Sequence, residues 1–333
     1  DIFMKSLIME GPAKSRVIDI EIPTPGPGEV LVKMKYCGVC SSELEPWKTA
    51  VNGQTFGHEP MGTIEAVGQG VTGLEKNDRV TGLSSPCYSQ YTIMKEENCV
   101  VIPEAVADED AMGEALACLI NVGAQMALAA PGDPFVVVGC GYMGLGTISL
   151  MRAMGAGTII GVDIREEARE NALKYGADVV YSPDTLPEEY FFSKHNFGGH
   201  VLGPGRKKEM FSIGFSRVEE FAGTGSALRL AGDITGMAGC LGIGGYHLGG
   251  DRNIDFQQWN YKMMKVLNTQ IRDDDLATRY CRQALDLIAR GQWKFTGTVN
   301  SRHIYPLEEF DRCQYELEHK PAGFIKALIR CND

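Results

Sequence analysis

A glycine-rich segment in the middle of the chain has the residue types and spacing that bind phosphate groups. The apolar run 135–138 is followed by Gly139, Gly141 and Gly144, which form the pattern G-x-G-x-x-G at the start of a helix-like stretch. In such a turn the glycines allow a tight bend, a close approach of a pyrophosphate and close helix-strand packing, and the helix N-terminus attracts the phosphates. Asp163 ends the next apolar run, where its carboxylate can accept hydrogen bonds from a ribose. Structural turns match this glycine pattern by chance, but the full order of strand, glycines, helix, strand and acid predicts dinucleotide binding.

The acid at Asp163 also indicates which dinucleotide binds. Its carboxylate would repel the 2′-phosphate of NADP, so the sequence favours NAD, although the nearby Arg165 weakens this preference. The candidate cofactor contacts are Gly139, Gly141, Tyr142, Met143 and Gly144 in the turn, and Asp163, Ile164 and Arg165 after the second apolar run.

Four residues before this segment have side chains that bind transition metals: Cys40, His58, Glu59 and Glu114. Zinc takes thiolate, imidazole and carboxylate ligands, and a catalytic zinc has three protein ligands and one open position. Each residue also has an ordinary structural explanation, such as a small buried cysteine, a turn histidine or a carboxylate at a helix N-terminus. The residue types therefore leave a catalytic metal site and separate structural roles both open. The pair Cys37 and Cys40 has no second C-x-x-C, so a closed four-cysteine zinc site is not expected.

Length and composition limit the class of protein. A chain of 333 residues predicts about two domains with a sizeable core. The formal net charge of −11 disfavours nucleic acids and anionic membrane surfaces as partners. The ten cysteines are scattered and no secretory segment precedes them, so we expect a reducing cytoplasm. Glycines interrupt the longest apolar run, 135–154, which predicts a buried strand and helix and not a membrane span.

Two kinds of hydrophobic pattern indicate which elements position these residues. Residues 15–22 and 29–35 alternate between apolar and polar side chains around a Pro/Gly-rich turn, which predicts a mainly β N-terminal part. Further on, short apolar runs at 135–138, 158–162 and 240–243 alternate with helix-like stretches, which predicts a doubly wound parallel sheet. The expected fold class is therefore α/β joined to a mainly β part.

The C-terminal part contains further elements of both kinds. An acidic helix start at 273–275 leads into the amphipathic run 276–290, which predicts a surface helix. Residues 323–329 are mostly apolar and predict a closing strand.

The motifs, taken in chain order, resemble those of the zinc-dependent medium-chain dehydrogenase/reductase family. They are Glu29–Lys33, Cys37–Glu43, Gly57–Gly62, Val67–Gly68, Asp78–Val80, the glycine-rich turn, Tyr305–Glu309 and Gly323–Lys326. The resemblance spans nearly the whole chain. It implies a GroES-like catalytic domain, residues 1–125 and 272–333, and a Rossmann NAD-binding domain, residues 126–271. In that family zinc and nicotinamide meet in the cleft between the two domains.

The resemblance also implies a ligand set for zinc. Cys40 and His58 resemble the first two ligands, and Glu114 resembles the third ligand of the sorbitol and threonine dehydrogenase branches. Ala115 stands where those branches have the proline of Glu-Pro-Leu. Glu59 resembles the acid that lies beside the metal and exchanges onto it. Because Cys40 and Glu114 already balance the charge of Zn²⁺, a further permanent carboxylate would weaken the pull of the metal on a substrate oxygen. We therefore expect Glu59 to bind only transiently.

Several neighbouring residues are implied to transfer protons or to border the substrate. Ser42 matches the residue that takes the proton of the substrate hydroxyl, and Glu43 replaces the aspartate that orients the ligand histidine. Glu45 stands where many relatives have a relay histidine, so it is a catalytic candidate whose part in the proton exit route is open. Trp47, Cys87 and Glu45 are expected to border the substrate, with core packing as an equal alternative for Trp47.

Two segments depart from the family pattern. Relatives carry a four-cysteine structural-zinc lobe where this chain has the short loop 81–90, so we expect one catalytic zinc per chain. The span 187–217 is longer than expected between two Rossmann strands, and it either covers the cleft, forms an interface or is a solvated surface insertion. Its basic and imidazole side chains are His195, His200, Arg206, Lys207 and Lys208.

The implied reaction is the reversible oxidation of a secondary alcohol to a ketone, with hydride transfer to NAD. The backbone of Ile243, Gly244 and Gly245 is implied to fix the nicotinamide carboxamide. The segments 244–247 and 258–262 are similar to those of relatives that act on polyols, sugars or cyclitols. We therefore expect a small-molecule alcohol or ketone substrate and a homodimer or homotetramer. The alternatives are an amino-alcohol dehydrogenase of the threonine type, an internal-redox enzyme that re-reduces its product with bound NAD, and a non-catalytic family member.

Overall fold

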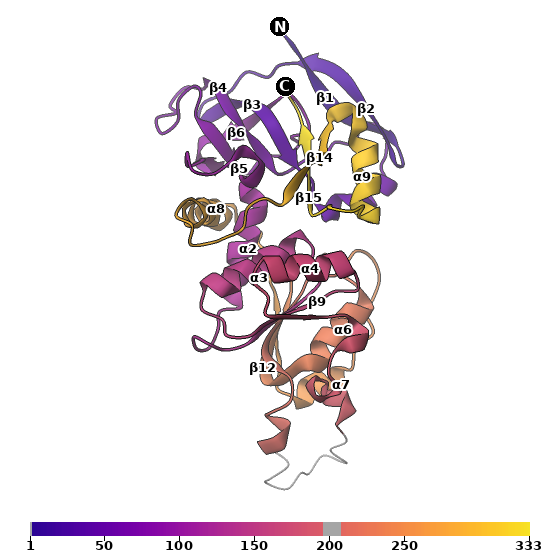
Figure 1. Ribbon diagram of the computed structural model, residues 1–333. Coiled ribbons are helices and arrows are strands. Elements are labelled where there is room, and N and C mark those ends of the chain that lie inside the picture. The colour runs from indigo at the N-terminus through magenta and orange to yellow at the C-terminus, as the bar shows by residue number, and fades with distance from the viewer. Residues whose placement is uncertain (1, 196–207) are drawn as a thin grey trace. The chain divides into compact units, whose positions relative to one another are not determined.

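Figure 1 shows the computed structural model of the protein, which describes residues 2–195 and 208–333. The chain divides into two compact units. The first unit contains residues 1–120 and 271–333, and the second contains residues 121–270. Within the two described ranges, every helix is too short or too polar to cross a membrane.

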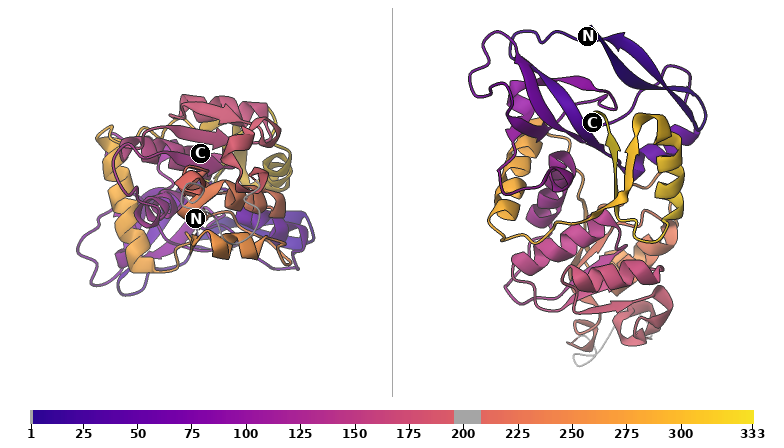
Figure 2. Two further views of the ribbon diagram at one scale, coloured as in Figure 1. Left: turned by 90° about the horizontal axis from the view of Figure 1, so that it is seen from below. Right: turned by 45° about the horizontal axis from the view of Figure 1, so that its top comes forward.

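The first unit is built mainly from antiparallel strands, as the alternating pattern predicted. In the described part of the chain, β1 (Phe3–Gly11) and β2 (Lys14–Glu21) form a hairpin beside a seven-stranded sheet with the order β14-β15-β3-β4-β5-β7, to which β6 adds by pairing with β3. The strands of this sheet are β3 (Glu29–Gly38), β4 (Pro60–Val67), β5 (Arg79–Gly82), β6 (Tyr91–Lys95), β7 (Cys99–Val101), β14 (Val299–Pro306) and β15 (Lys326–Arg330). The helices are α1 (Leu44–Lys48), the start of α2 (Gly113–Gln125), α8 (Asp274–Ala289) and α9 (Phe310–His319). Ser15 in β2 donates its amide hydrogen to Asp311 in α9 (2.9 Å), which joins the hairpin to that helix (Figure 2).

The end of β3 positions the candidate metal ligands. Its last residues pair with the start of β4 on one side and with β15 on the other. The amide of Gly38 donates to the carbonyl of Glu59 (2.9 Å), and the amide of Val39 donates to the carbonyl of Ala327 (3.0 Å). Cys40, which follows β3, is therefore held next to the residues that precede β4 and those that begin β15.

Two glycines let these segments approach closely. A Cβ atom added to Gly38 would lie 1.9 Å from Oε2 of Glu59. Gly57 has a φ of +101°, in the left-handed region that favours glycine, and a Cβ atom there would lie 2.8 Å from the backbone nitrogen of Tyr88. Larger residues at either position would displace the segment that carries His58 and Glu59.

The second unit contains the parallel sheet that the apolar runs predicted. Across the described residues it has six strands in the order β10-β9-β8-β11-β12-β13, and all neighbouring pairs are parallel. The strands are β8 (Phe135–Val138), β9 (Ile159–Val162), β10 (Val179–Tyr181), β11 (Phe215–Glu220), β12 (Thr235–Ile243) and β13 (Lys265–Asn268). The helices are α3 (Tyr142–Ala153), α4 (Glu166–Lys174), α6 (Gly225–Ile234) and α7 (Phe256–Tyr261). Helices α3 and α4 pack against β8, β9 and β10, and α6 packs against β11 and β12 (Figure 1).

The strand order reverses between β8 and β11. In open α/β sheets a ligand binds at the carboxyl ends of the strands, at such a switch point. Gly139 follows β8, and Phe221, which follows β11, donates its amide hydrogen to the carbonyl of Val138 (2.7 Å). The glycine-rich turn therefore lies where this type of sheet binds its ligand.

The described ends of the 187–217 span pack onto the second unit. Phe192, Met210 and Ile213 form a small buried cluster with Met237 and Tyr261 at its border. His195 is half-buried and Lys208 is exposed. The remaining basic and imidazole residues of the span, His200, Arg206 and Lys207, lie outside the described residues, so the role of the span stays a prediction.

Candidate functional site

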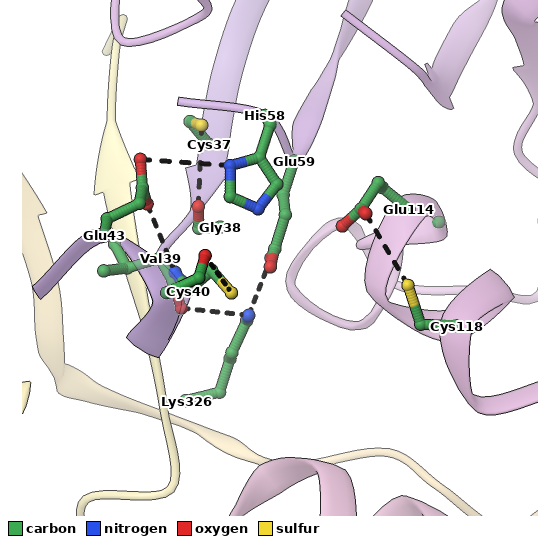
Figure 3. A network of polar contacts seen from close by, with 12 residues as sticks. Cys37, Gly38, Val39, Cys40, Glu43, His58, Glu59, Glu114, Cys118 and Lys326 are labelled. Atoms are coloured by element: carbon green, nitrogen blue, oxygen red, sulfur yellow. Dashed lines mark hydrogen bonds and ion pairs between the residues drawn. The ribbon is translucent and has the colours of Figure 1, made fainter. Parts of the chain in front are cut away.

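Three of the four candidate metal ligands lie together at the end of the first unit's sheet. In the described ranges, Cys40, His58 and Glu59 form a group whose ligand atoms all lie within 4.8 Å of one another. Cys40 and His58 are half-buried, and Glu59 is fully buried. Figure 3 shows their side chains converging, as the pairing of β3 with β4 requires.

A buried lysine balances the charge of Glu59. The Nζ atom of Lys326 lies 2.6 Å from Oε2 of Glu59 and donates to the carbonyl of Val39 (3.1 Å) (Figure 3). Burial alone would lower the pKa of Lys326, but the negative charges of Glu59 and Cys40 raise it above its usual value. Sequence reasoning gave Lys326 no role in the site. The sequence did contain one signal for this role. Lys326 lies in the mostly apolar closing strand, and a charged side chain that is buried there needs a partner of opposite charge.

Glu43 lies beside His58, the candidate ligand histidine. It is buried, and it accepts hydrogen bonds from the Tyr88 hydroxyl (2.7 Å) and the Gly57 amide (3.0 Å). Its Oε2 atom lies 3.9 Å from Nδ1 of His58. Burial raises the pKa of Glu43, against the opposing effect of His58. The acid therefore lies beside the histidine, as the resemblance implied. Tyr88, which sequence reasoning missed, holds it there.

The raised pKa of His58 indicates that the cluster of Cys40, His58 and Glu59 attracts positive charge. Burial alone would lower that pKa, but a hydrogen bond to Cys40 and the charges of Glu59, Cys40 and Glu43 raise it to about 10. A thiol, an imidazole and a carboxylate that share this excess of negative potential form a donor set that suits zinc. The residues present therefore fit the metal that the resemblance implies.

Glu114 lies outside the group of three. It is the second residue of α2, and its carboxylate points toward the side on which Glu59 lies (Figure 3). Burial and the charge of Glu59 raise the pKa of Glu114, and Cys118, one turn further along α2, donates its thiol hydrogen to Oε1 (3.6 Å). The structure does not bring Glu114 to ligand distance of Cys40 and His58, so its role as the third ligand stays a prediction.

The expected proton-transfer and substrate residues have different surroundings. The hydroxyl of Ser42 donates to the sulfur of Cys40 (3.1 Å), whereas Glu45 is exposed on α1. Trp47 is buried, and its indole nitrogen donates to Asp311 (2.8 Å), which supports the core-packing alternative.

The expectation that Cys87 borders the substrate is wrong, because Cys87 is fully buried. Its sulfur lies 3.4 Å from that of Cys37 in the core of the unit.

The glycine-rich turn of the second unit has the local geometry that its sequence implied. Gly139 has a φ of +97°, and a Cβ atom on Gly144 would lie 1.9 Å from the carbonyl oxygen of Gly139. The carboxylate of Asp163 accepts hydrogen bonds from the amides of Cys140 and Arg165 (2.8 Å each). This acid therefore joins the turn to the end of β9.

The other candidate cofactor residues lie at the same edge of the sheet. Tyr142 and Met143 begin α3 and are half-buried, and Ile164 is exposed. At the end of β12, which includes Ile243, the amides of Gly244 and Gly245 both donate to the carbonyl of Glu220 (2.9 and 2.8 Å).

Comparison with known proteins identifies the class. Residues 26–104 match the family model of the alcohol dehydrogenase GroES-like domain, and residues 143–290 match that of the zinc-binding dehydrogenases. Together the two matches cover well over half of the chain. The chain belongs to the zinc-dependent medium-chain dehydrogenase/reductase family.

Its curated relatives are distant and are matched only in part. The chain is 30% identical to D-xylulose reductase A of Aspergillus oryzae where the two align, and the match covers 54% of this chain and 61% of that protein. It is 29% identical to the starvation-sensing protein RspB of Escherichia coli where the two align, and the match covers 57% of this chain and 66% of that protein. The chain thus spans less than two thirds of the length of these relatives.

Solved structures share the fold across the whole chain. A 2R,3R-butanediol dehydrogenase from Bacillus subtilis has a TM-score of 0.79 and 22% identity, with 99% of this chain and 100% of that chain covered. An oxidoreductase of unknown specificity from Escherichia coli has a TM-score of 0.81 and 22% identity at the same coverage. The RspB alcohol dehydrogenase of Escherichia coli CFT073, solved with NADH, also has a TM-score of 0.79, 22% identity and that coverage.

The ion pair of Lys326 and Glu59 makes a prediction for the metal-free protein. Lys326→Met leaves Glu59 buried without its partner and should lower the free energy of unfolding by about 3–5 kcal/mol. The double variant Lys326→Met/Glu59→Gln should recover part of this loss, because no unpaired charge remains. Urea denaturation measures both, with Lys95→Met as the control, since Lys95 is exposed. If Lys326→Met were as stable as the starting protein, the ion pair would not organise the site.

Proposed function

We propose that the protein is a zinc-dependent oxidoreductase that transfers a hydride between NAD and a secondary alcohol of a polyol, sugar or cyclitol. The convergence of Cys40, His58 and Glu59 at one end of the first unit's sheet is the observation that carries this proposal. The glycine-rich turn with Asp163 supports the cofactor, and its acid supports NAD over NADP. The relatives named xylulose reductase support a polyhydroxylated substrate.

The ligands of the metal follow from the charges around it. We assign Cys40, His58 and Glu114 as the permanent ligands, because a thiolate and one carboxylate balance Zn²⁺. Glu59 is already paired with Lys326, so it lies beside the metal without making the site more negative. Zinc bound there would supply the Lewis acidity that lowers the pKa of an alcohol hydroxyl.

The remaining roles belong to the polar residues of the chain. Ser42 takes the proton of the substrate hydroxyl, supported by the position of its hydroxyl 3.1 Å from the sulfur of Cys40. Glu45, exposed on the next helix, receives protons for release to solvent. The backbone of Ile243, Gly244 and Gly245 holds the nicotinamide carboxamide.

We propose that the enzyme works as a homodimer or homotetramer. Strand β13 is at an edge of the described parallel sheet, and Met263 and Val266 at this edge are exposed. Exposed apolar side chains beside an unpaired strand edge favour association with another chain.

A substrate panel tests the proposed reaction. The zinc-loaded protein with NAD should produce NADH, measured by absorbance, from one or more polyols, sugars or cyclitols. Cys40→Ser should abolish turnover but keep the affinity for NADH, because Cys40 and the glycine-rich turn belong to different units.

Other results of the substrate panel would favour a different reaction. Activity with amino alcohols alone would indicate a dehydrogenase of the threonine type. Conversion of substrate without NADH accumulation would indicate internal redox. A protein that binds no zinc after reconstitution and oxidises no alcohol would contradict the proposal.

Two carboxylate variants test the ligand assignment. Glu114→Ala should lose zinc, because it removes a permanent ligand. Glu59→Gln, made together with Lys326→Met so that no buried charge loses its partner, should keep zinc but slow turnover, because it removes the group that binds during ligand exchange. Metal analysis and steady-state rates measure both effects, and Glu104→Ala, at an exposed position of the same unit, serves as the control. Full zinc occupancy and activity in Glu114→Ala would point to Glu59 as the third ligand.

A further inference from the structure

Another buried acid, Glu219, lies in the parallel sheet and has no part in the function proposed so far. It is the fifth residue of β11 and its side chain is completely buried. Its Oε1 atom accepts a hydrogen bond from the hydroxyl of Thr269 (2.5 Å). A Cβ atom on Gly242 would lie 1.7 Å from Oε2, and one on Gly244 would lie 2.6 Å from Oε1. The carboxyl group therefore lies across the end of β12, in space that these two glycines leave open.

The environment of Glu219 is unfavourable for a carboxylate. Its Oε2 atom has no hydrogen-bond partner among the described residues. Burial is the main cause that raises the pKa of Glu219 to about 8, and the charge of the adjacent Glu220 acts in the same direction. The group is therefore a neutral acid near pH 7. An unsatisfied buried polar atom destabilises a fold, so an apolar residue would be more stable at this position. This cost indicates that the acid serves another purpose.

Hydrogen bonds connect Glu219 to the segment that ends β12. The amide of Thr269 donates to the carbonyl of Ile243 (3.0 Å), and the side chain of Gln270 donates to the carbonyl of Gly244 (3.0 Å). Asn121 donates to the carbonyl of Thr269 (3.0 Å) and fixes it from the other side. Glu219 therefore determines, through Thr269, how the Ile243–Gly245 backbone is held at the carboxyl edge of the sheet.

We propose that Glu219 is a positioning residue for the nicotinamide end of NAD. This inference rests on the proposed function, in which the backbone of residues 243–245 holds the nicotinamide carboxamide. Glu219 does not touch the cofactor, because its carboxyl group is buried beneath Gly242 and Gly244. It acts by fixing Thr269 and by filling the space beside the two glycines with a neutral polar group. The adenosine and pyrophosphate parts of NAD, which the glycine-rich turn would bind, do not depend on it.

The comparison of NADH with ADP-ribose, which lacks nicotinamide, separates this role from a general structural one. Glu219→Leu removes the acceptor for Thr269 and should weaken NADH binding by about tenfold, the effect of one lost hydrogen bond. Its affinity for ADP-ribose should stay within about twofold of the starting protein. Glu219→Gln keeps an acceptor oxygen of the same size and should bind NADH nearly as well as the starting protein. Isothermal titration calorimetry measures all of these affinities.

A second variant avoids dependence on the folding of Glu219→Leu. Thr269→Val keeps the side-chain shape but removes the hydroxyl that donates to Glu219. It should show the same selective loss of NADH affinity.

The outcomes distinguish the two proposals. Equal losses for NADH and ADP-ribose in these variants, or no loss for either ligand, would overturn the positioning role of Glu219 and leave the proposed function intact. A starting protein that binds neither ligand would instead contradict the proposed function itself.

Discussion

The candidate metal centre depends on the buried ion pair between Lys326 and Glu59. This pair joins the two strands that flank the end of β3. Lys326 begins β15 and Glu59 directly precedes β4, and both strands pair with the end of β3, which leads into Cys40. The ammonium group places a positive charge beside Glu59 and near Cys40, in a poorly solvated region where a negative charge needs a partner. A carboxylate at Glu59 therefore adds no net charge to the site. The same pair therefore supports the local fold and sets how strongly a bound cation can act on a substrate.

Buried carboxyl groups recur in both units, and each is stabilised in a different way. Glu43 accepts hydrogen bonds from a tyrosine and a backbone amide, and Glu59 pairs with a lysine. Glu114 accepts a weak hydrogen bond from the Cys118 thiol, and burial raises its pKa. A metal ion would supply its carboxylate with a counter-charge. Among the described residues, Glu219 in the second unit accepts one hydroxyl hydrogen bond, and burial raises its pKa to about 8. Glu43 and Glu59 thus have partners that hold them in place, and we propose that Glu114 takes a bound cation as its partner.

The sequence predicted much of this arrangement because the relevant signals are local. Short apolar runs between helix-like stretches predicted the parallel sheet, the order of strand, glycines, helix and acid around Gly139 predicted its dinucleotide-binding turn, and alternation predicted the β strands of the first unit. Cys40 and His58 were found by residue type and by their family motifs. The role of Lys326 was missed because its partner precedes a strand more than two hundred residues earlier in the sequence, and only the pairing of both strands with β3 brings them together. Cys87 was misplaced for a related reason, since its burial depends on core packing against Cys37 and not on the loop that carries it.

The measurement that most directly tests the central claim is X-ray absorption spectroscopy at the zinc edge of the reconstituted protein. The account predicts one zinc per chain, with a single sulfur neighbour at about 2.3 Å and nitrogen or oxygen neighbours at about 2.0–2.2 Å. The sulfur signal should disappear in Cys40→Ser, whatever zinc that variant retains. A zinc environment without sulfur, or one with four sulfur neighbours, would contradict the assignment of Cys40, His58 and a carboxylate as the metal centre.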